Sequence, residues 1–280
     1  MNMPIISIIL PTFNGEKYIL QTIQSCIQQT FADWELIIVD DGSTDDTPNI
    51  IASYIASDKR IRSVKHPSNK KLPAALNTGF SIAKGHFFTW ISDDNIFYQN
   101  ALQKMLETLN KNPTTDIVYA DMDIINDTGQ KIGKWPVRDV KLLGYRGNTI
   151  GGCFLYRRNV HESLRGFRED FFLAEDYHFW LLASENFIFY RIKEPLYGYR
   201  QHDLSLTSRN DEIINKTQEM LKNTITITQK KWLKAGILVH MAVNYRLQKL
   251  YKESLKYLLR AFATCPVGVL LYSPKLFFLS

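Results

Sequence analysis

The sequence predicts an α/β fold whose first half is built on parallel strands. Apolar runs of strand length alternate with helical patterns along this half, with strands expected at 5–10, 36–39, 61–66 and 87–91. Two of these strands end in paired acids, Asp40-Asp41 and Asp93-Asp94. Because ligands of an open α/β sheet bind outside the carboxyl ends of the strands, these acids are expected at a binding edge.

Helical patterns separate the predicted strands. A first helix is predicted from four apolar residues that share one face, namely Ile19, Leu20, Ile23 and Ile27. Further helices are expected at 48–55 and 74–83, and loops at 11–15 and 67–72, the second of which contains Lys70 and Lys71. The repeat of strand and helix indicates right-handed βαβ units. No Gly-x-Gly-x-x-Gly follows any strand, which disfavours a dinucleotide site of the dehydrogenase type.

The second half changes character. The pattern predicts a helix at 101–109, strands at 117–125 and 131–135 around a hairpin-like turn, a strand at 151–156, a short helix after Glu175-Asp176 and a last strand at 187–192. Residues 199–202 are expected in a loop. From 211 onward the pattern is helical only. Two antiparallel helices are predicted within 232–266, the second facing the first through Tyr251, Leu255, Leu258 and Phe262.

Composition indicates a globular protein, with 45% hydrophobic and 22% charged residues. The net charge of +6 suits an anionic substrate or a membrane surface. No nucleic-acid partner is expected, because the basic residues are scattered and no nucleic-acid motif is present. Cys26, Cys153 and Cys265 form no metal-ligand pattern and are expected to be free thiols in a reducing compartment. The apolar N-terminal run has no basic leader and is predicted to be a strand, not a signal peptide.

The last apolar segment, 267–279, is interrupted by Pro274 and Lys275. It is shorter than the ~20 residues that cross a bilayer. Its basic neighbours suit peripheral contact with a membrane surface, and packing on the rest of the protein is the other interpretation. We therefore expect a cytoplasmic protein with contact at the inner face of a membrane.

The strand-end acids suit a cation or a polar ligand. Asp93 and Asp94 offer oxygen ligands of the kind that Mg²⁺ or Mn²⁺ takes when it bridges to substrate phosphates. The competing interpretation is a turn with two solvated acids. Asp40 and Asp41 likewise repel each other and need a partner, such as a base, a ribose or a cation.

Two residues further along the chain have chemistry that allows two roles each. Asp176 stands at a predicted helix start, where it is either an N-cap or a general base, and residue chemistry alone does not choose between them. His202 is either a metal or phosphate contact or an ordinary surface residue. Trp180 follows the apolar pattern of its helix and is predicted to lie in the core.

Several motifs, in their order and spacing, resemble those of the family 2 glycosyltransferases over residues 3–208. They are Ser7-Ile8-Ile9-Leu10-Pro11-Thr12-Phe13-Asn14, Gln29-Thr30-Phe31, Glu35-Leu36-Ile37-Ile38-Val39-Asp40-Asp41-Gly42-Ser43-Thr44-Asp45, Ala75-Leu76-Asn77-Thr78-Gly79, Ser92-Asp93-Asp94 and Glu175-Asp176. The resemblance implies the GT-A fold, which is a Rossmann-like mixed sheet flanked by helices, here with a C-terminal helical extension. It implies a glycosyltransferase domain over 1–210, with a nucleotide-binding half of about 1–98 and an acceptor half of about 99–210, and the extension over 211–280.

The resemblance also implies an activity. It is the inverting, metal-dependent transfer of a sugar from a nucleotide-diphosphate sugar, by family frequency a UDP-sugar, to a saccharide or lipid-linked acceptor in cell-surface polysaccharide or glycan synthesis. By position, Asp41 would hold the base with Asp40, Pro11, Thr12 and Phe13 around it, and Asp93 would contact the ribose or sugar. Asp94 and His202 would bind Mn²⁺ or Mg²⁺, and Asp176 would be the catalytic base.

The chain departs from the family pattern at two places. Ile91 stands two residues before Asp93, where the family usually has an acid, and Leu76 stands where it often has an arginine. The first departure keeps open a non-catalytic or degenerate sugar-nucleotide binder. A phosphatase or mutase with an aspartate nucleophile is a further alternative, but its acids stand at i and i+2, whereas Asp40 and Asp41 are adjacent.

Overall fold

The computed structural model describes residues 3–202, 205–206 and 210–272, and the chain divides into two compact units. The first unit comprises Met1–Val137, Gly151–Glu169 and Phe187–Ser205. The second comprises Arg138–Ile150, Asp170–Asn186 and Leu206–Ser280. Two internal segments thus group with the C-terminal helices, and the predicted domain boundary at 210 stays a prediction.

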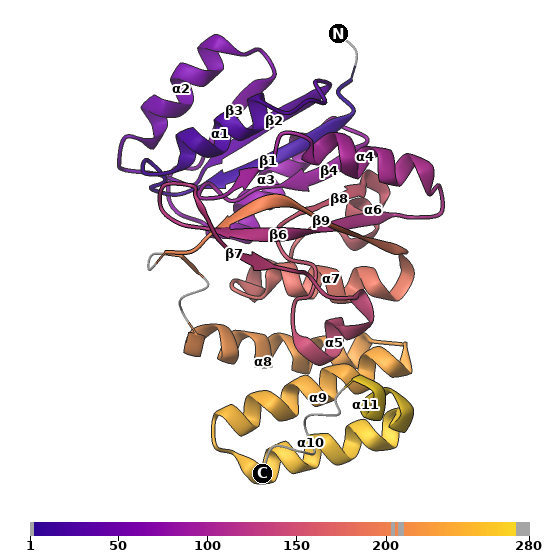
Figure 1. Ribbon diagram of the computed structural model, residues 1–280. Coiled ribbons are helices and arrows are strands. Elements are labelled where there is room, and N and C mark those ends of the chain that lie inside the picture. The colour runs from indigo at the N-terminus through magenta and orange to yellow at the C-terminus, as the bar shows by residue number, and fades with distance from the viewer. Residues whose placement is uncertain (1–2, 203–204, 207–209, 273–280) are drawn as a thin grey trace. The chain divides into compact units, whose positions relative to one another are not determined.

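The first unit is organised by one mixed sheet. Its strands are β1 (Ile6–Thr12), β2 (Trp34–Asp40), β3 (Ile61–Lys65), β4 (Phe87–Trp90), β5 (Ile96–Phe97), β6 (Ile117–Ile125), β7 (Lys131–Trp135), β8 (Phe154–Arg157) and β9 (Phe189–Arg200). The order is β3-β2-β1-β4-β8-β6-β9-β5, with β7 paired to β6 (Figure 1). Strands β1 to β4 pair in parallel, whereas β8 runs antiparallel to both β4 and β6. The predicted α/β class with a mixed sheet is confirmed.

Helices flank this sheet. They are α1 (Ile19–Ile27), α2 (Thr47–Ser57), α3 (Leu72–Ile82), α4 (Ala101–Lys111) and α6 (Arg158–Leu164). Right-handed crossovers place α1 and α2 on one face and α3 on the other, because the chain reverses its direction across the sheet between β3 and β4. On the first face, the Leu102 amide donates to Gln29 Oε1 at 3.0 Å and ties α4 to the end of α1. On the second, α3 meets α6 through the rings of Phe80 and His161, 4.4 Å apart.

Three expectations for this unit were wrong in detail. Strand β1 continues through Thr12, so Pro11 and Thr12 lie in a strand and not in a loop. Strand β9 continues through Arg200, because it pairs with β6 as far as Ile125. Leu20 is 44% exposed, since one residue of helix turns it about 100° away from the buried Ile19.

A buried polar cluster joins the first two strands. Ser7 and Glu35 are register partners on β1 and β2, and Ser7 Oγ donates to Glu35 Oε1 at 2.6 Å. Glu35 also accepts from the Lys84 amide at 2.6 Å and from Arg62 Nη2 at 2.8 Å. Burial raises the pKa of Glu35, but these hydrogen bonds outweigh it and the net pKa is lowered. The cluster therefore explains how a charged residue stands in a buried strand.

The second unit is helical. It contains η1 (Val140–Leu142), α5 (Leu143–Arg146), α7 (Glu175–Asn186), α8 (Asn210–Ile227), α9 (Lys231–Leu247), α10 (Tyr251–Thr264) and α11 (Pro266–Tyr272), and a 3-10 turn, η2 (Glu169–Phe171), begins at the unit border. Its core includes Tyr145 of α5, Val239 of α9, Ala261 of α10 and Val269 of α11. A Cβ at Gly236 would lie 2.8 Å from the Tyr145 ring, so only glycine allows α9 this close to α5.

The predicted pair of C-terminal helices is confirmed, but its predicted contact face is wrong in part. Helices α9 and α10 pack along each other. Ala261 and the partly buried Leu258 and Phe262 face inward, whereas Tyr251 and Leu255 are 65% and 59% exposed. Residues 273–279 of the predicted apolar tail lie outside the described residues.

Substitution of Glu35 by glutamine should lower the free energy of unfolding at pH 7 by about 1–3 kcal/mol, since hydrogen bonds to a buried charge are lost. The folded pKa of Glu35 is lowered, so its stabilisation is present above the unfolded pKa of about 4.3 and is lost as pH falls through the folded pKa. Urea unfolding of both proteins should therefore show a difference at pH 7 that shrinks below about pH 4. The exposed Glu16→Gln is the control, and a pH-independent difference would contradict this account.

Candidate functional site

The carboxyl ends of three neighbouring parallel strands bring the predicted nucleotide-binding residues and Asp94 to one edge of the sheet. Thr12 and Asp40 are register partners at the ends of β1 and β2, and the Asp41 amide donates to the Thr12 carbonyl at 2.8 Å. Strand β4 pairs with β1 on its other side and leads to Asp93 and Asp94. The two predicted acidic pairs therefore stand at the ends of β2 and β4, the two strands on either side of β1, as the sequence indicated.

Asp41 is buried and held by its own chain. His66 Nδ1 lies 2.6 Å from Asp41 Oδ1, and the amides of Lys70 and Lys71 donate to its two oxygens at 2.9 and 2.8 Å. His66 Nε2 in turn lies 3.0 Å from Thr78 Oγ1. Asp41 therefore shapes the loop between β3 and α3, and it is the backbone amides of the two lysines that contribute here. Sequence reasoning missed His66, which carries no motif of its own.

Asp40 makes fewer contacts. Its Oδ1 accepts from the Ser43 amide at 2.8 Å, and its Oδ2 lies 3.4 Å from Lys65 Nζ. The loop after β1 is tied to this turn, because the Asn14 amide donates to Ser43 Oγ at 2.9 Å and Asn14 Oδ1 accepts from the Thr44 amide at 2.9 Å. Beside this tie Phe13 is 45% exposed, which leaves its ring available to a ligand.

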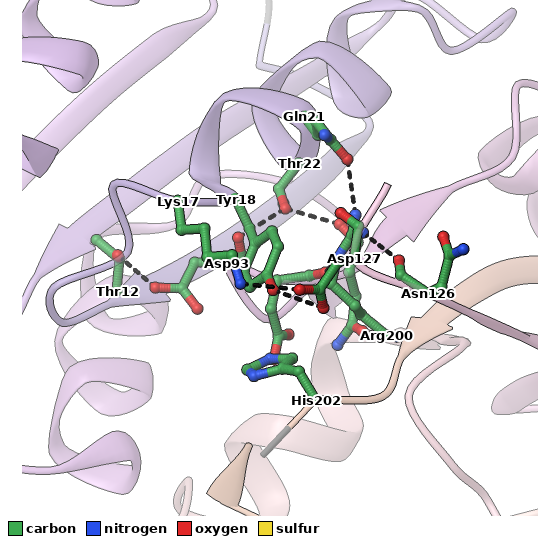
Figure 2. Close-up of polar contacts among 12 residues, drawn as sticks. Thr12, Lys17, Tyr18, Gln21, Thr22, Asp93, Asn126, Asp127, Arg200 and His202 are labelled. Atoms are coloured by element: carbon green, nitrogen blue, oxygen red, sulfur yellow. Dashed lines mark hydrogen bonds and ion pairs between the residues drawn. The ribbon is translucent and has the colours of Figure 1, made fainter. Parts of the chain in front are cut away.

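Asp93 is enclosed at the same edge (Figure 2). Thr12 Oγ1 donates to Asp93 Oδ2 at 2.5 Å, and Thr22 Oγ1 donates to the Asp93 carbonyl at 2.9 Å. A side chain at Gly15 would overlap Asp93 Oδ2, so this position needs glycine. Burial, with the charge of Asp94, raises the pKa of Asp93 to about 7. A cation next to Asp93 would favour its charged form.

Asp94 and His202 meet, as the resemblance implied. His202 Nε2 lies 3.0 Å from Asp94 Oδ2, and the His202 ring packs 5.0 Å from the ring of Tyr18. Among the described residues, neither Asp94 Oδ1 nor His202 Nδ1 has a hydrogen-bond partner, although both atoms are buried. The facing atoms, a carboxylate oxygen and an imidazole nitrogen 3.0 Å apart, are of the kinds that a divalent cation takes as ligands.

The donor set is incomplete within the part of the chain that the structure describes. No group of three His, Cys, Asp or Glu residues there could hold a metal ion. Ile91, at the position where the family usually has an acid, is fully buried and its amide donates to the Ile9 carbonyl at 2.9 Å. Asp94 and His202 therefore supply two ligands, and a metal would need further oxygens, as substrate phosphates provide.

Arg200 is the largest charged side chain buried at this edge, and sequence reasoning gave it no role. Its guanidinium donates to the carbonyls of Asp94 at 2.6 Å, Asn126 at 2.5 Å and Asp127 at 2.7 Å, and to Gln21 Oε1 at 2.7 Å (Figure 2). One residue thus ties the Asp93-Asp94 turn to the β6–β7 turn and to α1. Its only signal in the sequence is a lone arginine at the end of an otherwise uncharged run, 195–199.

Tyr18 and Asp127 complete this cluster. Tyr18 OH and Lys17 Nζ each donate to the Asp127 carboxylate at 2.9 Å. The Arg200 guanidinium also stacks over the Tyr18 ring, 4.6 Å from its centroid. Tyr18 therefore contacts both the buried guanidinium of Arg200 and the ring of His202, the candidate metal ligand.

Asp176 lies in the second unit, at the start of α7. Its carboxylate accepts from Asn148 Nδ2 at 2.7 Å and from the Tyr177 amide at 2.6 Å. Burial raises the pKa of Asp176. Burial and the charge of Asp176 raise the pKa of the adjacent Glu175 to about 8, and Glu175 Oε2 has no hydrogen-bond partner among the described residues. Glu175 therefore keeps its proton near neutral pH, and Asp176 is the one that ionises first. Trp180 is fully buried in the same helix, as predicted.

Replacing the buried Arg200 with methionine should lower the free energy of unfolding by about 3–5 kcal/mol, because four acceptors would lose their donor. Arg158→Met is the matched control. Arg158 is a partly exposed arginine with an i,i+4 partner, Glu162, and its loss should cost about 1 kcal/mol or less. Urea unfolding measures both. Equal losses would show that the Arg200 contacts carry no special weight.

Comparison with known proteins places these residues in a family. The sequence model of Glycosyl transferase family 2 matches residues 7–165. An uncharacterised glycosyltransferase of Rickettsia prowazekii is 31% identical over 217 residues, which cover 74% of this chain and 64% of that protein. Chondroitin synthase of Escherichia coli is 29% identical over 206 residues, which cover 71% of this chain and 29% of the synthase. The chain thus spans just under two thirds of the rickettsial relative's length.

Solved structures share the fold. Staphylococcus aureus TarS in complex with UDP-GlcNAc has a TM-score of 0.71 at 18% identity, covering 92% of this chain and 79% of that one. The mannosyltransferase PcManGT of Pyrobaculum calidifontis, in complex with GDP-Man and Mn²⁺, has a TM-score of 0.66 at 17% identity, covering 100% and 82%. The fold is therefore the GT-A fold of these enzymes, and the match over more than half of its length makes this chain a member of glycosyltransferase family 2.

Proposed function

We propose that this glycosyltransferase moves a sugar from a nucleotide-diphosphate sugar, a UDP-sugar, to a hydroxyl of a saccharide or lipid-linked acceptor. We further propose that configuration at the anomeric carbon inverts and that the product belongs to a cell-surface polysaccharide or glycan. The observation that carries the proposal is the convergence of Asp40-Asp41 and Asp93-Asp94 on one sheet edge, with His202 beside Asp94. The neighbours that contain UDP-GlcNAc or GDP-Man support the class of donor.

The nucleotide would bind over the ends of β1 and β2. The exposed ring of Phe13 is suited to stack on a base, and Asp40 has fewer hydrogen bonds to the protein than Asp41. Asp41, bonded to His66 and two amides, keeps the loop in place and has less capacity left for a ligand. Pro11 and Thr12, at the end of strand β1, would lie beneath the nucleotide. Asp93 would contact the ribose or the donor sugar.

A divalent cation, Mn²⁺ or Mg²⁺, would be held by Asp94 and His202, whose facing atoms Oδ2 and Nε2 lie 3.0 Å apart. When bound, such a metal offsets the charge that grows on a diphosphate leaving group. Arg200 keeps Asp94 in position through its carbonyl, and Thr12 does the same for Asp93.

Asp176 would remove the proton from the acceptor hydroxyl. Asn148 and the Tyr177 amide orient its carboxylate, and its raised pKa strengthens it as a base. Attack by the acceptor oxygen on the anomeric carbon breaks the bond to the diphosphate in one displacement. A single displacement inverts the configuration and leaves no covalent sugar on the protein.

A sugar-nucleotide-binding protein without catalysis is the second candidate. Buried Ile91 and the incomplete donor set of the described residues favour it. It predicts that donor binding survives while transfer and donor hydrolysis are both absent in Mn²⁺. The two experiments below separate donor binding from transfer.

Donor binding should depend on metal. We expect calorimetry to show that UDP binds at least about 10-fold more tightly with Mn²⁺ than with EDTA. Loss of a residue that only orients a metal ligand already costs about 10–100-fold in metal affinity or activity, and removal of the metal itself should cost no less. Asp94→Ala should make the two affinities equal. The exposed Asp46→Ala, in the turn before α2, should leave the metal dependence intact. Equal wild-type affinity in Mn²⁺ and EDTA would rule out the proposed metal site.

Transfer should depend on Asp176. Asp176→Asn should reduce the rate by about 10²–10⁴-fold, the usual contribution of a general base, while the asparagine oxygen can still accept from the Tyr177 amide. Nucleotide affinity should not change. Because its folded pKa is raised, the wild-type rate should increase with pH through a range above that of an ordinary aspartate. Glu175→Gln should retain most activity, since Glu175 is already protonated near neutral pH. The opposite outcome for the two variants would make Glu175 the base.

A further inference from the structure

Two helices of the second unit carry exposed apolar side chains that its core does not use. Tyr251, Leu255 and Leu259 of α10 and Val267, Leu270 and Leu271 of α11 are each 57–65% exposed. We call these six residues the apolar stripe. Both helices already have a buried side, through Ala261 and Val269, so the stripe is additional to the face that packs on α9.

A basic row lies beside the stripe on α10. At 3.6 residues per turn, Tyr251, Leu255 and Leu259 share one line along the helix, and the following residues Lys252, Lys256 and Arg260 share the next, about 100° around. All three basic side chains are exposed. Between 247 and 272 the sequence has four basic residues, the fourth being Lys249, against a single acid, Glu253.

Hydropathy alone does not make this region a membrane span. Within the described residues, no single helix is long and apolar enough to cross a bilayer. Helices α10 and α11 pass that test only as a pair, and the pair is bent by 116°.

We propose that the apolar stripe and the basic row dock on the surface of an anionic lipid bilayer. Leucine and valine side chains on a helix, next to exposed lysine and arginine, are the features of helices that lie in the headgroup region of a membrane. The basic row adds electrostatic attraction to anionic lipid. A purely apolar contact with another protein surface would not need these charges. This surface function goes beyond sugar transfer and needs neither donor nor metal.

Charge argues against two other partners for the apolar stripe, namely a second copy of this chain and segment 273–280. A second copy of this chain would bring an identical basic row to the same contact. Segment 273–280 of this chain contains Lys275 and no acid, so its charge also has the wrong sign. An anionic lipid surface has both the apolar layer and the opposite charge.

Vesicle co-sedimentation of the full chain tests the proposal. Vesicles of phosphatidylcholine alone should leave the protein in the supernatant, whereas vesicles that also contain phosphatidylglycerol should pellet it at low salt and release it at high salt. Lys252→Gln with Lys256→Gln should weaken binding by about 20–30-fold, at about 5-fold for each lysine. Leu255→Gln with Leu259→Gln should weaken it by at least about 10-fold.

Matched controls come from the first unit. Lys134→Gln with Lys193→Gln removes two exposed lysines, and Ile132→Gln with Ile188→Gln removes two exposed apolar residues. Both controls should bind vesicles as the wild type does. The proposal is overturned if the wild type does not pellet with anionic vesicles, or if the stripe variants bind normally. It is also overturned if light scattering shows a dimer that Leu255→Gln with Leu259→Gln dissociates. A lowered Tm of that variant without wild-type vesicle binding would instead show that segment 273–280 covers the stripe.

Discussion

The buried guanidinium of Arg200 is the constraint on which the candidate site depends. Burial lowers the pKa of Arg200, and the negative charges of Asp94 and Asp127 counteract that cost. Its hydrogen bonds are satisfied only when α1, the turn after β4 and the β6–β7 turn all stand in place. A buried charge that loses one partner is expensive, so these segments are held together as a set. The same bonds that stabilise the sheet edge therefore fix the position of Asp94.

The charges at this edge are arranged so that a cation completes them. Asp93 and Asp94 are adjacent and half-buried, and partial burial with the charge of Asp94 raises the pKa of Asp93. Side chains contact part of this charge, Thr12 through a hydrogen bond to Asp93 and His202 at 3.0 Å from Asp94. Asp94 Oδ1 is left without a hydrogen bond from any described residue. An unpaired buried carboxylate oxygen is costly in an empty protein, and that cost is relieved when a ligand or metal arrives. The edge is thus preorganised for a charged ligand in the sense that the described residues leave one of its carboxylate oxygens unsatisfied.

Sequence reasoning succeeded where the signal is local and failed where it is not. Strand-end acids are visible because an apolar run and the residues that follow it are contiguous, so Asp40-Asp41 and Asp93-Asp94 were predicted correctly to share an edge. The partners of these acids come from afar: His66 lies 25 residues from Asp41, and Arg200 lies 106 residues from Asp94. Helical spacing shows which residues share a face but not which face is covered, and for this reason Tyr251 and Leu255 were assigned to a contact that they do not make. The end of β9 was missed because its length is set by pairing with β6, not by its own composition.

Two neighbouring carboxyls in the second unit differ in protonation: Glu175 keeps its proton and Asp176 ionises, as the proposed base requires. Glu175 is buried and Asp176 is half-buried, and two adjacent charges without a cation would repel each other. Burial decides which of them ionises, because burial and the charge of Asp176 raise the pKa of Glu175 to about 8, whereas the carboxylate of Asp176 accepts from Asn148 and from the Tyr177 amide. The negative charge therefore resides on Asp176. Glu175 is protonated and neutral, so it does not repel that charge. A helix cap alone would explain the bond to the Tyr177 amide. A cap would not explain why Glu175 is buried beside Asp176 and keeps its proton as a result. The pKa values of both residues are raised, and a base that works near neutral pH needs a raised pKa.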